Sequence, residues 1–494
     1  MTVPFNNIPQ NLRVPLFYAE MDNSAAGYFQ VSQRALLVGQ KLAAGTGIAN
    51  KPVIVASESN AIALCGRGSM LARMFNFYRA NDLLGEIWLM PLDEPPAGVV
   101  ATGTIAFAGT ATAAGTLSLW IAGQRVQTAV ASGDASTAVA TAVAAAVNAA
   151  LDLPVTASVA TSTVTLTCRW KGDTGNDITI ISNYRGAAGN EITPAGITPT
   201  ITAMASGTGA PVLTTAIAAM GDDEYDFVVM PFTDTTSLDA LKTEMNDTAG
   251  RWSYARQVYG HVYSAKRGIL SALTTFGGAR NDQHATVAAI EANVPTPCWE
   301  YAAAYGARNA VYIKADPARP TQTGELTNVL PALAGQRFTL TERQSLLNYG
   351  VATSYFGGGA VRIERAVTTY QKNTWGQSDP SYLDSETLHT STYVLRYLRQ
   401  RITSKYARHK LANDGTRFGE GSAIVTPSIV KGELIAAYRD LEENGIVENA
   451  NAFKAALIVE RPTTDPNRLD VLFAPDYINQ LRIFAVLAQF RLQF

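Results

Sequence analysis

Apolar and polar residues follow two different periods along this chain, and the changes of period mark its divisions. Short apolar runs alternate with stretches of helical spacing over residues 31–95 and again over 210–360. Buried strands that alternate with helices are typical of a mostly parallel sheet covered by helices. We therefore expect one discontinuous α/β core. Its strands are predicted at 35–39, 52–56, 86–90, 226–230, 260–263 and 286–290, and its helices at 66–80, 236–250, 265–276 and 299–310.

Residues 96–209 separate the two parts of this core and are dominated by Ala, Thr, Gly, Ser and Val. Alternating strands are predicted at 116–121 and 164–168, with an alanine-rich helix at 135–151 between them. Low-complexity disorder would also bias the composition, but it does not require regular alternation. We predict a compact β-rich domain inserted at the surface, because the core pattern continues unbroken when this stretch is removed.

Beyond a run of three glycines, residues 361–494 predict an α+β domain. It begins with a strong strand at 361–370. A helix follows, with Asp379 as its N-cap and Pro380 at its first position. A second helix is predicted at 427–444 and a strand at 454–460. The inner face of the first helix is expected to hold Leu388, Leu395, Leu398 and Ile402.

The last stretch, 468–494, predicts two strands joined by a turn at residues 474–476. Chain ends are usually polar and frayed, whereas this one is rich in phenylalanine and must be docked on something. It is either a core strand of its own domain or a strand added to another chain, where side-chain alternation sets the register. The alternating set is Phe484, Val486, Ala488, Phe490, Leu492 and Phe494.

Residues 1–30 predict a second extended arm. Pro15 removes a ladder donor and confines its strand to an edge, and a turn is predicted at 22–24. A self-folded hairpin is the alternative. The apolar side chains of this arm are Val14, Leu16, Phe17 and Tyr18.

Composition narrows the functional classes. The 494 residues are 47% hydrophobic but only 16% charged, which fits a chain that buries surface in an assembly or one with an Ala/Gly/Thr-rich domain. The net charge of -2 provides no field for polyanions. Three widely spaced cysteines fit buried thiols in a reducing compartment, and the sequence shows neither a signal peptide nor a membrane-spanning run. We expect synthesis in a cytosol, without cofactor.

Catalytic and ligand-binding motifs are missing or incomplete. The four histidines have no zinc-ligand spacing, and neither a Gly-Lys dipeptide nor a GxGxxG turn occurs where nucleotide sites need them. Ser69 at a helix start and the turn Asp173-Thr174-Gly175 are weakly similar to protease motifs. A triad needs a histidine that can reach the serine, and an aspartic protease needs two Asp turns. A hydrolase is therefore a remote alternative.

The helix near residue 400 is strongly basic, and an acidic cluster follows near residue 440. Positive charge at a helix C-terminus complements the helix dipole, which is one interpretation. The other is an electrostatic contact with a neighbouring copy. Direct binding of nucleic acid is disfavoured, because aromatic side chains do not interleave with the charges. The candidate residues are Arg396, Arg399, Lys405, Arg408, Asp440 and Glu443.

Four stretches, in this order, resemble the tail sheath proteins of contractile bacteriophages, in particular the Mu-like branch. They are the arm at 13–24 with the strand at 34–39, the turn KGDTGNDI at 171–178, the strand ERAVTTY at 364–370, and the closing strands at 459–492. The last two are the more specific.

The resemblance implies a structural subunit rather than an enzyme, with a core of subtilisin-like topology. Such subunits stack as hexameric rings around a tail tube, with their termini joined to neighbouring subunits, and contract to drive the tube through the host envelope. The implied partners are further copies of the chain, the tube, the baseplate and a tail terminator, and the implied location is the virion tail. A non-contractile adhesin or baseplate protein is the alternative, suggested by the Thr/Ala-rich insertion.

Overall fold

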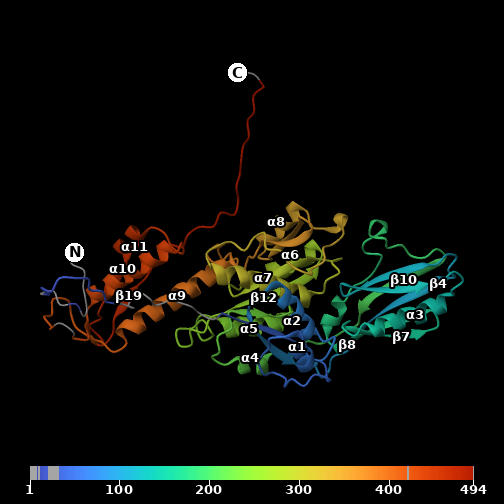
Figure 1. Cartoon of the computed structure of the whole chain (residues 1–494), viewed down its shortest axis with the longest axis horizontal. Helices are drawn as coiled ribbons and strands as arrows, with labels where there is room; N and C mark the ends of the chain where they lie inside the picture. Colours follow the sequence, from blue (N-terminus) through green and yellow to red (C-terminus); the bar gives the residue numbers. More distant parts are fainter. Residues whose placement is uncertain (1–7, 9–11, 21–32, 420–421, 493–494) are drawn as a thin grey trace. The chain divides into compact units, whose positions relative to one another are not determined.

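The computed structural model describes residues 8, 12–20, 33–419 and 422–492. The chain divides into two compact units, Met1–Ser32 and Gln33–Phe494, and the second contains the helices and sheets of Figure 1. Its central sheet has the order β13-β12-β11-β1-β3-β2, in which only the β2–β3 pair is antiparallel. The strands are β1 (Arg34–Gln40), β2 (Val53–Ile54), β3 (Glu86–Leu92), β11 (Phe227–Val229), β12 (His261–Gly268) and β13 (Ala285–Glu291).

This sheet forms because its strands are apolar on both faces. In β1 every residue from Ala35 to Gln40 is buried. Helices α2 and α7 pack against each other and against β1 and β12. Gly306 permits the approach of α7, since a Cβ there would lie 2.6 Å from Val229 Cγ2. The predicted mixed α/β core is confirmed. Its helices are α1 (Glu58–Cys65), α2 (Met70–Asn81), α4 (Thr214–Met220), α5 (Thr235–Met245), α6 (Leu270–Gly278), α7 (Cys298–Ala315) and α8 (Leu340–Asn348).

The inserted stretch folds as two antiparallel sheets with one helix, α3 (Ser136–Ala149). The sheet orders are β10-β4-β8-β7 and β6-β5-β9. The chain enters and leaves side by side, because Val99 and Thr208 pair through their backbones. The strands are β4 (Val100–Gly109), β5 (Gly115–Ile121), β6 (Gln124–Val130), β7 (Val155–Ala160), β8 (Thr163–Lys171), β9 (Ile180–Ser182) and β10 (Ile197–Ala205).

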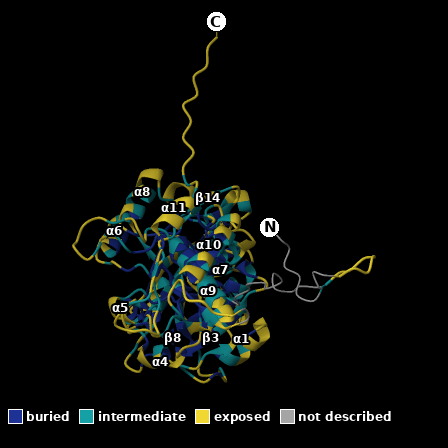
Figure 2. Ribbon diagram, turned by 90° about the vertical axis from the view of Figure 1, so that its left-hand side faces the viewer, coloured by how far each residue is buried: buried dark blue, intermediate teal, exposed yellow. Residues whose placement is uncertain are grey.

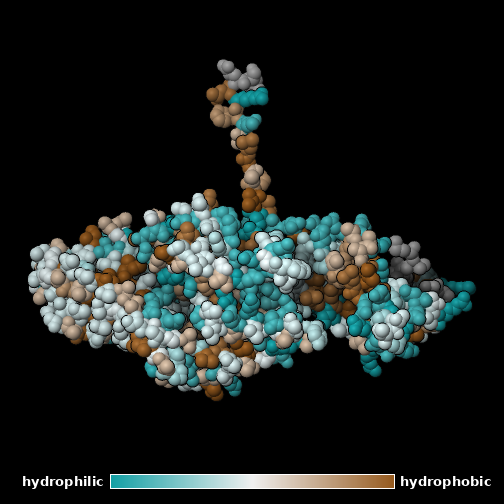
Figure 3. All heavy atoms as spheres, turned by 180° about the vertical axis from the view of Figure 1, so that it is seen from behind, coloured by the Kyte–Doolittle hydropathy of each residue, from teal (hydrophilic) through white to brown (hydrophobic). Residues whose placement is uncertain are grey.

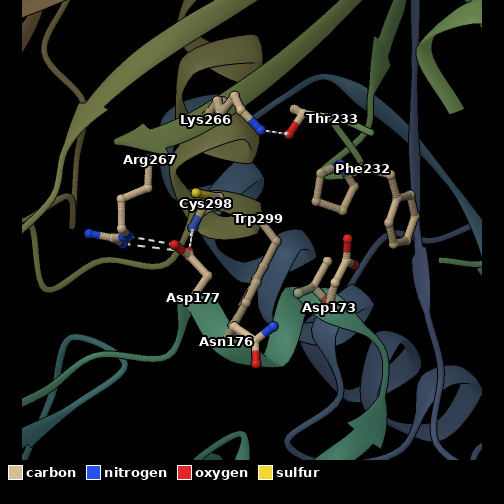
Figure 4. A pocket seen from close by; sticks show the side chains of 12 residues that line it. Asp173, Asn176, Asp177, Phe232, Thr233, Lys266, Arg267, Cys298 and Trp299 are labelled. Atoms are coloured by element: carbon tan, nitrogen blue, oxygen red, sulfur yellow. Dashed lines mark hydrogen bonds and ion pairs between the residues drawn. The ribbon is translucent and has the colours of Figure 1, made fainter. Parts of the chain in front are cut away.

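Side-chain contacts join this insertion to the core. Arg267 of β12 forms an ion pair with Asp177 of the insertion (Figure 4). It also donates to the carbonyls of Val294 and Thr296, at 2.6 and 2.7 Å. Trp170 meets Trp299 of α7 edge to face, with ring centroids 5.3 Å apart. The insertion is therefore held by buried polar and aromatic contacts as well as by its two connecting strands.

The C-terminal domain is organised by the long helix α9 (Ser385–Tyr406). Its first half reaches the core sheet, where the His389 ring stacks on Phe227. From Val394 onward it packs with α10 in a separate hydrophobic cluster that also includes Leu434. The remaining elements are β14 (Thr353–Gly357), β15 (Ala360–Arg365), β16 (Lys410–Leu411), β17 (Ile424–Val425), α10 (Pro427–Glu443), α11 (Ala450–Ala456), β18 (Ile458–Glu460) and β19 (Asp470–Leu472).

Several predicted elements end elsewhere in the structure. The helix predicted at 265–276 begins only at Leu270, because β12 continues to Gly268 and pairs with β13 throughout. The helix predicted to reach 250 ends at Met245. There the Asn246 carboxamide accepts the backbone N–H groups of residues 248–250 and replaces the helical bonds with a turn. Helix α1 and several strands of the insertion were not predicted.

The predictions for the C-terminal domain need more correction. Asp379 is not the N-cap of α9; its carboxylate accepts from Ser381 N and Tyr370 Oη, and the helix follows Asp384. Leu395 is 44% exposed, and its neighbour Val394 occupies the inner face. Three other bounds differ: the strand predicted at 361–370 ends at residue 365, residues 454–456 are helical, and the strand there begins at 458.

Candidate assembly segments and surfaces

The C-terminal segment leaves the folded unit as an extended chain of exposed residues (Figures 1 and 2). The first predicted strand is present as β19, which pairs with β18. The second is not a strand within the described residues, and it is not a core strand of its own domain. The exposed fractions are 81% for Ile483, 82% for Phe484, 69% for Val486, 85% for Leu487, 84% for Phe490 and 91% for Leu492.

Figure 3 shows many hydrophobic residues along this projecting segment, with some hydrophilic ones between them. Exposure of the hydrophobic side chains to water is unfavourable. Burying one such side chain stabilises by roughly 1.5–3 kcal/mol. Apolar patches of this kind mark sites of interaction with other molecules. The backbone of an extended segment also offers donors and acceptors to a sheet edge. The segment is therefore suited to strand addition. Phe494 lies outside the described residues.

The N-terminal segment, in the first unit, also exposes apolar side chains. Residues 12–20 contain no strand, and Leu16 and Phe17 are 91% and 89% exposed. Val14 and Tyr18 are also exposed, at 63% and 44%. The turn predicted at 22–24 lies outside the described residues. The four apolar side chains singled out in the sequence are thus available to a partner.

The predicted electrostatic cluster divides into internal and surface residues. The prediction that Arg396 lies at a surface between copies is corrected by the structure, because the side chain is buried. It pairs with Asp226 at 2.5 Å and with Glu224 at 2.8 Å, two residues that are distant from it in the sequence. Lys405 pairs with Glu433 at 2.7 Å. Asp440 pairs with Arg401 and accepts from Tyr397 Oη.

The other members of the cluster, Arg399, Arg408 and Glu443, are exposed. They form no ion pair with another residue of the described ranges. These three, and not Arg396, are available for a contact between copies.

The histidines and the serine at the helix start have structural surroundings. His261 bonds to Thr286 Oγ1 at 2.8 Å and His389 to Tyr263 Oη at 3.0 Å, both inside the core. Burial lowers the pKa of His389 to about 3, with a smaller contribution from Arg396. Ser69 is the N-cap of α2 and accepts from Ala72 N at 3.2 Å. Its role in capping explains why serine stands there.

Among the described residues, no group of three His, Cys, Asp or Glu side chains could hold a metal ion. A cavity of about 350 Å³ lies where β11 and β12 end, lined by Asp173, Asp177, Lys266 and Cys298 (Figure 4). Two of its charged groups are engaged with protein partners: Asp177 with Arg267 and the Cys298 N–H, and Lys266 with Thr233. Burial raises the pKa of the Cys298 thiol, so it is protonated.

In the part of the chain that the structure describes, no helix is both long enough and apolar enough to cross a membrane. The fold defines a class: a multidomain α/β protein that exposes two extended apolar segments among its described residues.

Comparison with known proteins identifies the family within that class. Three family descriptions match the chain: the phage tail sheath protein beta-sandwich domain at residues 96–198, the central domain at 206–369 and the C-terminal domain at 377–491. The chain is 43% identical over 493 residues to the Mu-like prophage FluMu tail sheath protein of Haemophilus influenzae, covering 99% of this chain and 100% of the relative. This protein belongs to the phage tail sheath family, which is structural.

Solved structures of sheath proteins were also found, at low sequence identity. The sheath tail protein of Desulfitobacterium hafniense is 11% identical with a TM-score of 0.47, over 94% of this chain and 100% of that chain. The sheath of an extracellular contractile injection system in its contracted state is 10% identical with a TM-score of 0.48, over 98% and 99%.

Proposed function

We propose that this protein polymerises as stacked hexameric rings around a tail tube and contracts to drive the tube through the host envelope. Its partners would be further copies of itself, the tube protein, the baseplate and a tail terminator. Assembly would take place in the cytoplasm of the bacterial host. The single observation that carries the proposal is the C-terminal segment from Ile483 to Leu492, which presents apolar side chains to water and forms no strand within the described residues.

Strand addition by this segment would join subunits and still allow them to move. Each backbone hydrogen bond contributes roughly 0.5–1.5 kcal/mol net, and buried apolar surface about 25 cal/mol per Å². An added strand of that strength would keep two subunits joined while the larger polar surfaces between them rearrange. Contraction would then be a two-state rearrangement of subunit interfaces. The N-terminal residues Val14, Leu16, Phe17 and Tyr18 would serve as a second connection.

The domain division fits this role. We propose arms at 1–30 and at the C-terminus, a core of 31–95 and 210–360 with subtilisin-like topology, an insertion of 96–209 at the outer surface, and a C-terminal domain of 361–494. The side-by-side entry and exit of the insertion at Val99 and Thr208 supports its placement as an appended domain. Arg399, Arg408 and Glu443 would contribute polar contacts between copies.

Electron microscopy of the purified chain at high concentration tests polymerisation. Ribbed, hollow tubes made of this protein alone are the expected result, or tubes formed on co-expression with a tube protein if a template is required. A chain that stays monomeric in both experiments would contradict the proposal.

Removal of residues 483–494 tests the segment itself. The truncated chain is expected to remain folded, because the removed side chains that the structure describes are exposed, but to form no tubes. A chain that unfolds when they are removed would show that these residues belong to its own core.

Two sets of substitutions refine this test. Replacing Phe484, Val486, Phe490 and Leu492 by Ser should abolish tubes, because this alternate set lies on one face of an added strand. Replacing Gln489 and Arg491 by Ser on the opposite face is the matched control and should have little effect. Equal effects of the two sets would argue against strand addition.

A further inference from the structure

The residues just before the exposed C-terminal segment are attached to the folded unit, although the side chain of Leu481 among them is 70% exposed. Tyr477 pairs with Val447, and Ile478 N donates to Ile446 O at 3.2 Å. Gln480 Nε2 donates to Ala318 O at 2.8 Å. Leu481 O accepts from Gln322 Nε2 at 3.3 Å. The attached stretch therefore runs from Tyr477 to Arg482, and it crosses from the C-terminal domain to the core.

Arg482 ends this stretch with a buried ion pair. Its side chain is only 11% exposed, whereas the next residue, Ile483, is 81% exposed. Nη2 lies 3.0 Å from Glu386 Oε1 and 3.3 Å from Asp384 Oδ1. Both carboxylates are at the start of α9, where a helix favours negative charge.

The receiving carboxylates are themselves fixed. Glu386 is fully buried and also accepts from the backbone N–H and hydroxyl of Thr321, each at 2.9 Å. Asp384 receives two hydrogen bonds from Arg365, at 2.7 and 2.8 Å. The guanidinium of Arg482 thus enters a preformed acidic site made by α9, β15 and the loop before residue 322. A buried carboxylate that loses its cation is strongly destabilised, so the contact resists opening.

We propose that Arg482 is the anchor that fixes where the C-terminal segment leaves the subunit and in which direction it points toward the next copy. The inference rests on the proposed function, since a fixed exit matters only if the segment reaches another subunit. Residues 477–482 belong to the donor subunit, and the exchangeable strand starts at Ile483. A loose exit would let the segment fold back or search many directions, at a cost in chain entropy on every assembly step.

Hydrogen exchange on the full-length, unassembled protein at low concentration tests the anchor directly. In the unmodified chain the amides of 478–482 are expected to exchange at least about tenfold more slowly than those of 484–492. Arg482→Gln should remove that difference, while the amides of β12 stay protected. Arg491→Gln, which changes an exposed arginine in the same segment, is the control and should leave residues 478–482 protected.

Arg482→Lys guards against a folding defect, because it keeps the charge but loses the planar donor set and should give partial protection. The proposed anchor is contradicted if residues 478–482 exchange as fast as 484–492 in the unmodified chain, or if Arg482→Gln leaves their protection unchanged.

Tube formation by the same variants is measured separately, and Arg482→Gln should slow it. Tubes formed at the unmodified rate by a variant with a loosened segment would overturn the role in assembly. Failure of the unmodified chain to form tubes would instead count against the proposed function.

Discussion

At the scale of single residues, α9 is held on the core sheet by groups whose charge state is set by burial. His389 stacks on Phe227 and bonds to Tyr263, and burial keeps its ring neutral. His261 lies beside it and also has its pKa lowered, by burial first and by the neighbouring His389 next. Arg396, further along the helix, meets Asp226 of the core. Protonation of the histidines would put uncompensated charge into this contact.

Stability is therefore expected to fall with acid through His389. Its folded-state pKa of about 3 lies below the ordinary value of 6.5, so the unfolded state binds the proton first as the pH falls. The stabilisation is complete above pH 6.5 and is lost as the pH falls from there toward 3, at about 1.4 kcal/mol per pH unit. Between pH 6.5 and 4.5 the unmodified chain should lose roughly 2–3 kcal/mol more than His389→Gln, measured by urea unfolding. His409→Gln, at an exposed histidine, should keep the full pH dependence.

Residue patterns predicted the apolar character of the C-terminal segment but missed the buried ion pairs of Arg396 and Arg482, for a physical reason. The apolar side chains at 483–492 were recognisable because alternation is local, but the sequence left open whether they are buried in their own domain or exposed. Arg396 was assigned to a surface cluster because its basic neighbours are close in sequence, whereas its acidic partner Asp226 is 170 residues away. Arg482 and its acidic site escaped notice for the same reason. Pairing across the fold leaves no periodic signal in the sequence.

At the scale of elements, boundaries depend on competing caps. Asp379 and Asp384 are both suitable N-caps, and Pro380 favoured the first. The structure uses the carboxylate of Asp379 in a turn, and α9 starts five residues later. The buried strands of the core were predicted because runs such as that of β1 are apolar throughout. The short strands of the insertion were harder, because alternation over Ala and Thr is weak.

Ser69 gives an element-scale test of capping against catalysis. Ser69→Ala removes the side-chain acceptor for Ala72 N and should lower the free energy of unfolding by about 1 kcal/mol. Tube formation should be unaffected, because the serine is buried in its own chain. Ser132→Ala, at an exposed turn, should change stability by less than about 0.5 kcal/mol. A loss no greater than that of the Ser132 variant would contradict the capping role.

At the scale of the whole second unit, the insertion and the core share one hydrophobic cluster, and polar contacts reinforce their junction. The insertion and the core share the Arg267–Asp177 pair, in which both side chains are 14% exposed. Arg267 also satisfies carbonyls in the loop that leads into α7. The family match to the beta-sandwich domain at 96–198 covers the same stretch.

Arg267→Met should loosen that junction. Removing one partner of a buried pair leaves Asp177 without its cation and typically costs about 3–5 kcal/mol. We expect the insertion and core to unfold in separate thermal transitions, with faster amide exchange around residues 173–177 and 296–299. Arg399→Met, at an exposed arginine, serves as the control. A single transition at the unmodified temperature would show that the strands and the tryptophan pair suffice.

The position of α9 has a mechanical consequence. The start of this helix holds Arg482, where the C-terminal segment departs, and its middle holds Asp226 through Arg396. The same carboxylate accepts the backbone N–H of Arg34, at the beginning of β1. Tension applied between the two ends of the folded unit would therefore be transmitted through α9 and through the ion pairs of Arg396 and Arg482. The insertion contributes no residue to these contacts, so natural variation or an engineered replacement there would leave them intact.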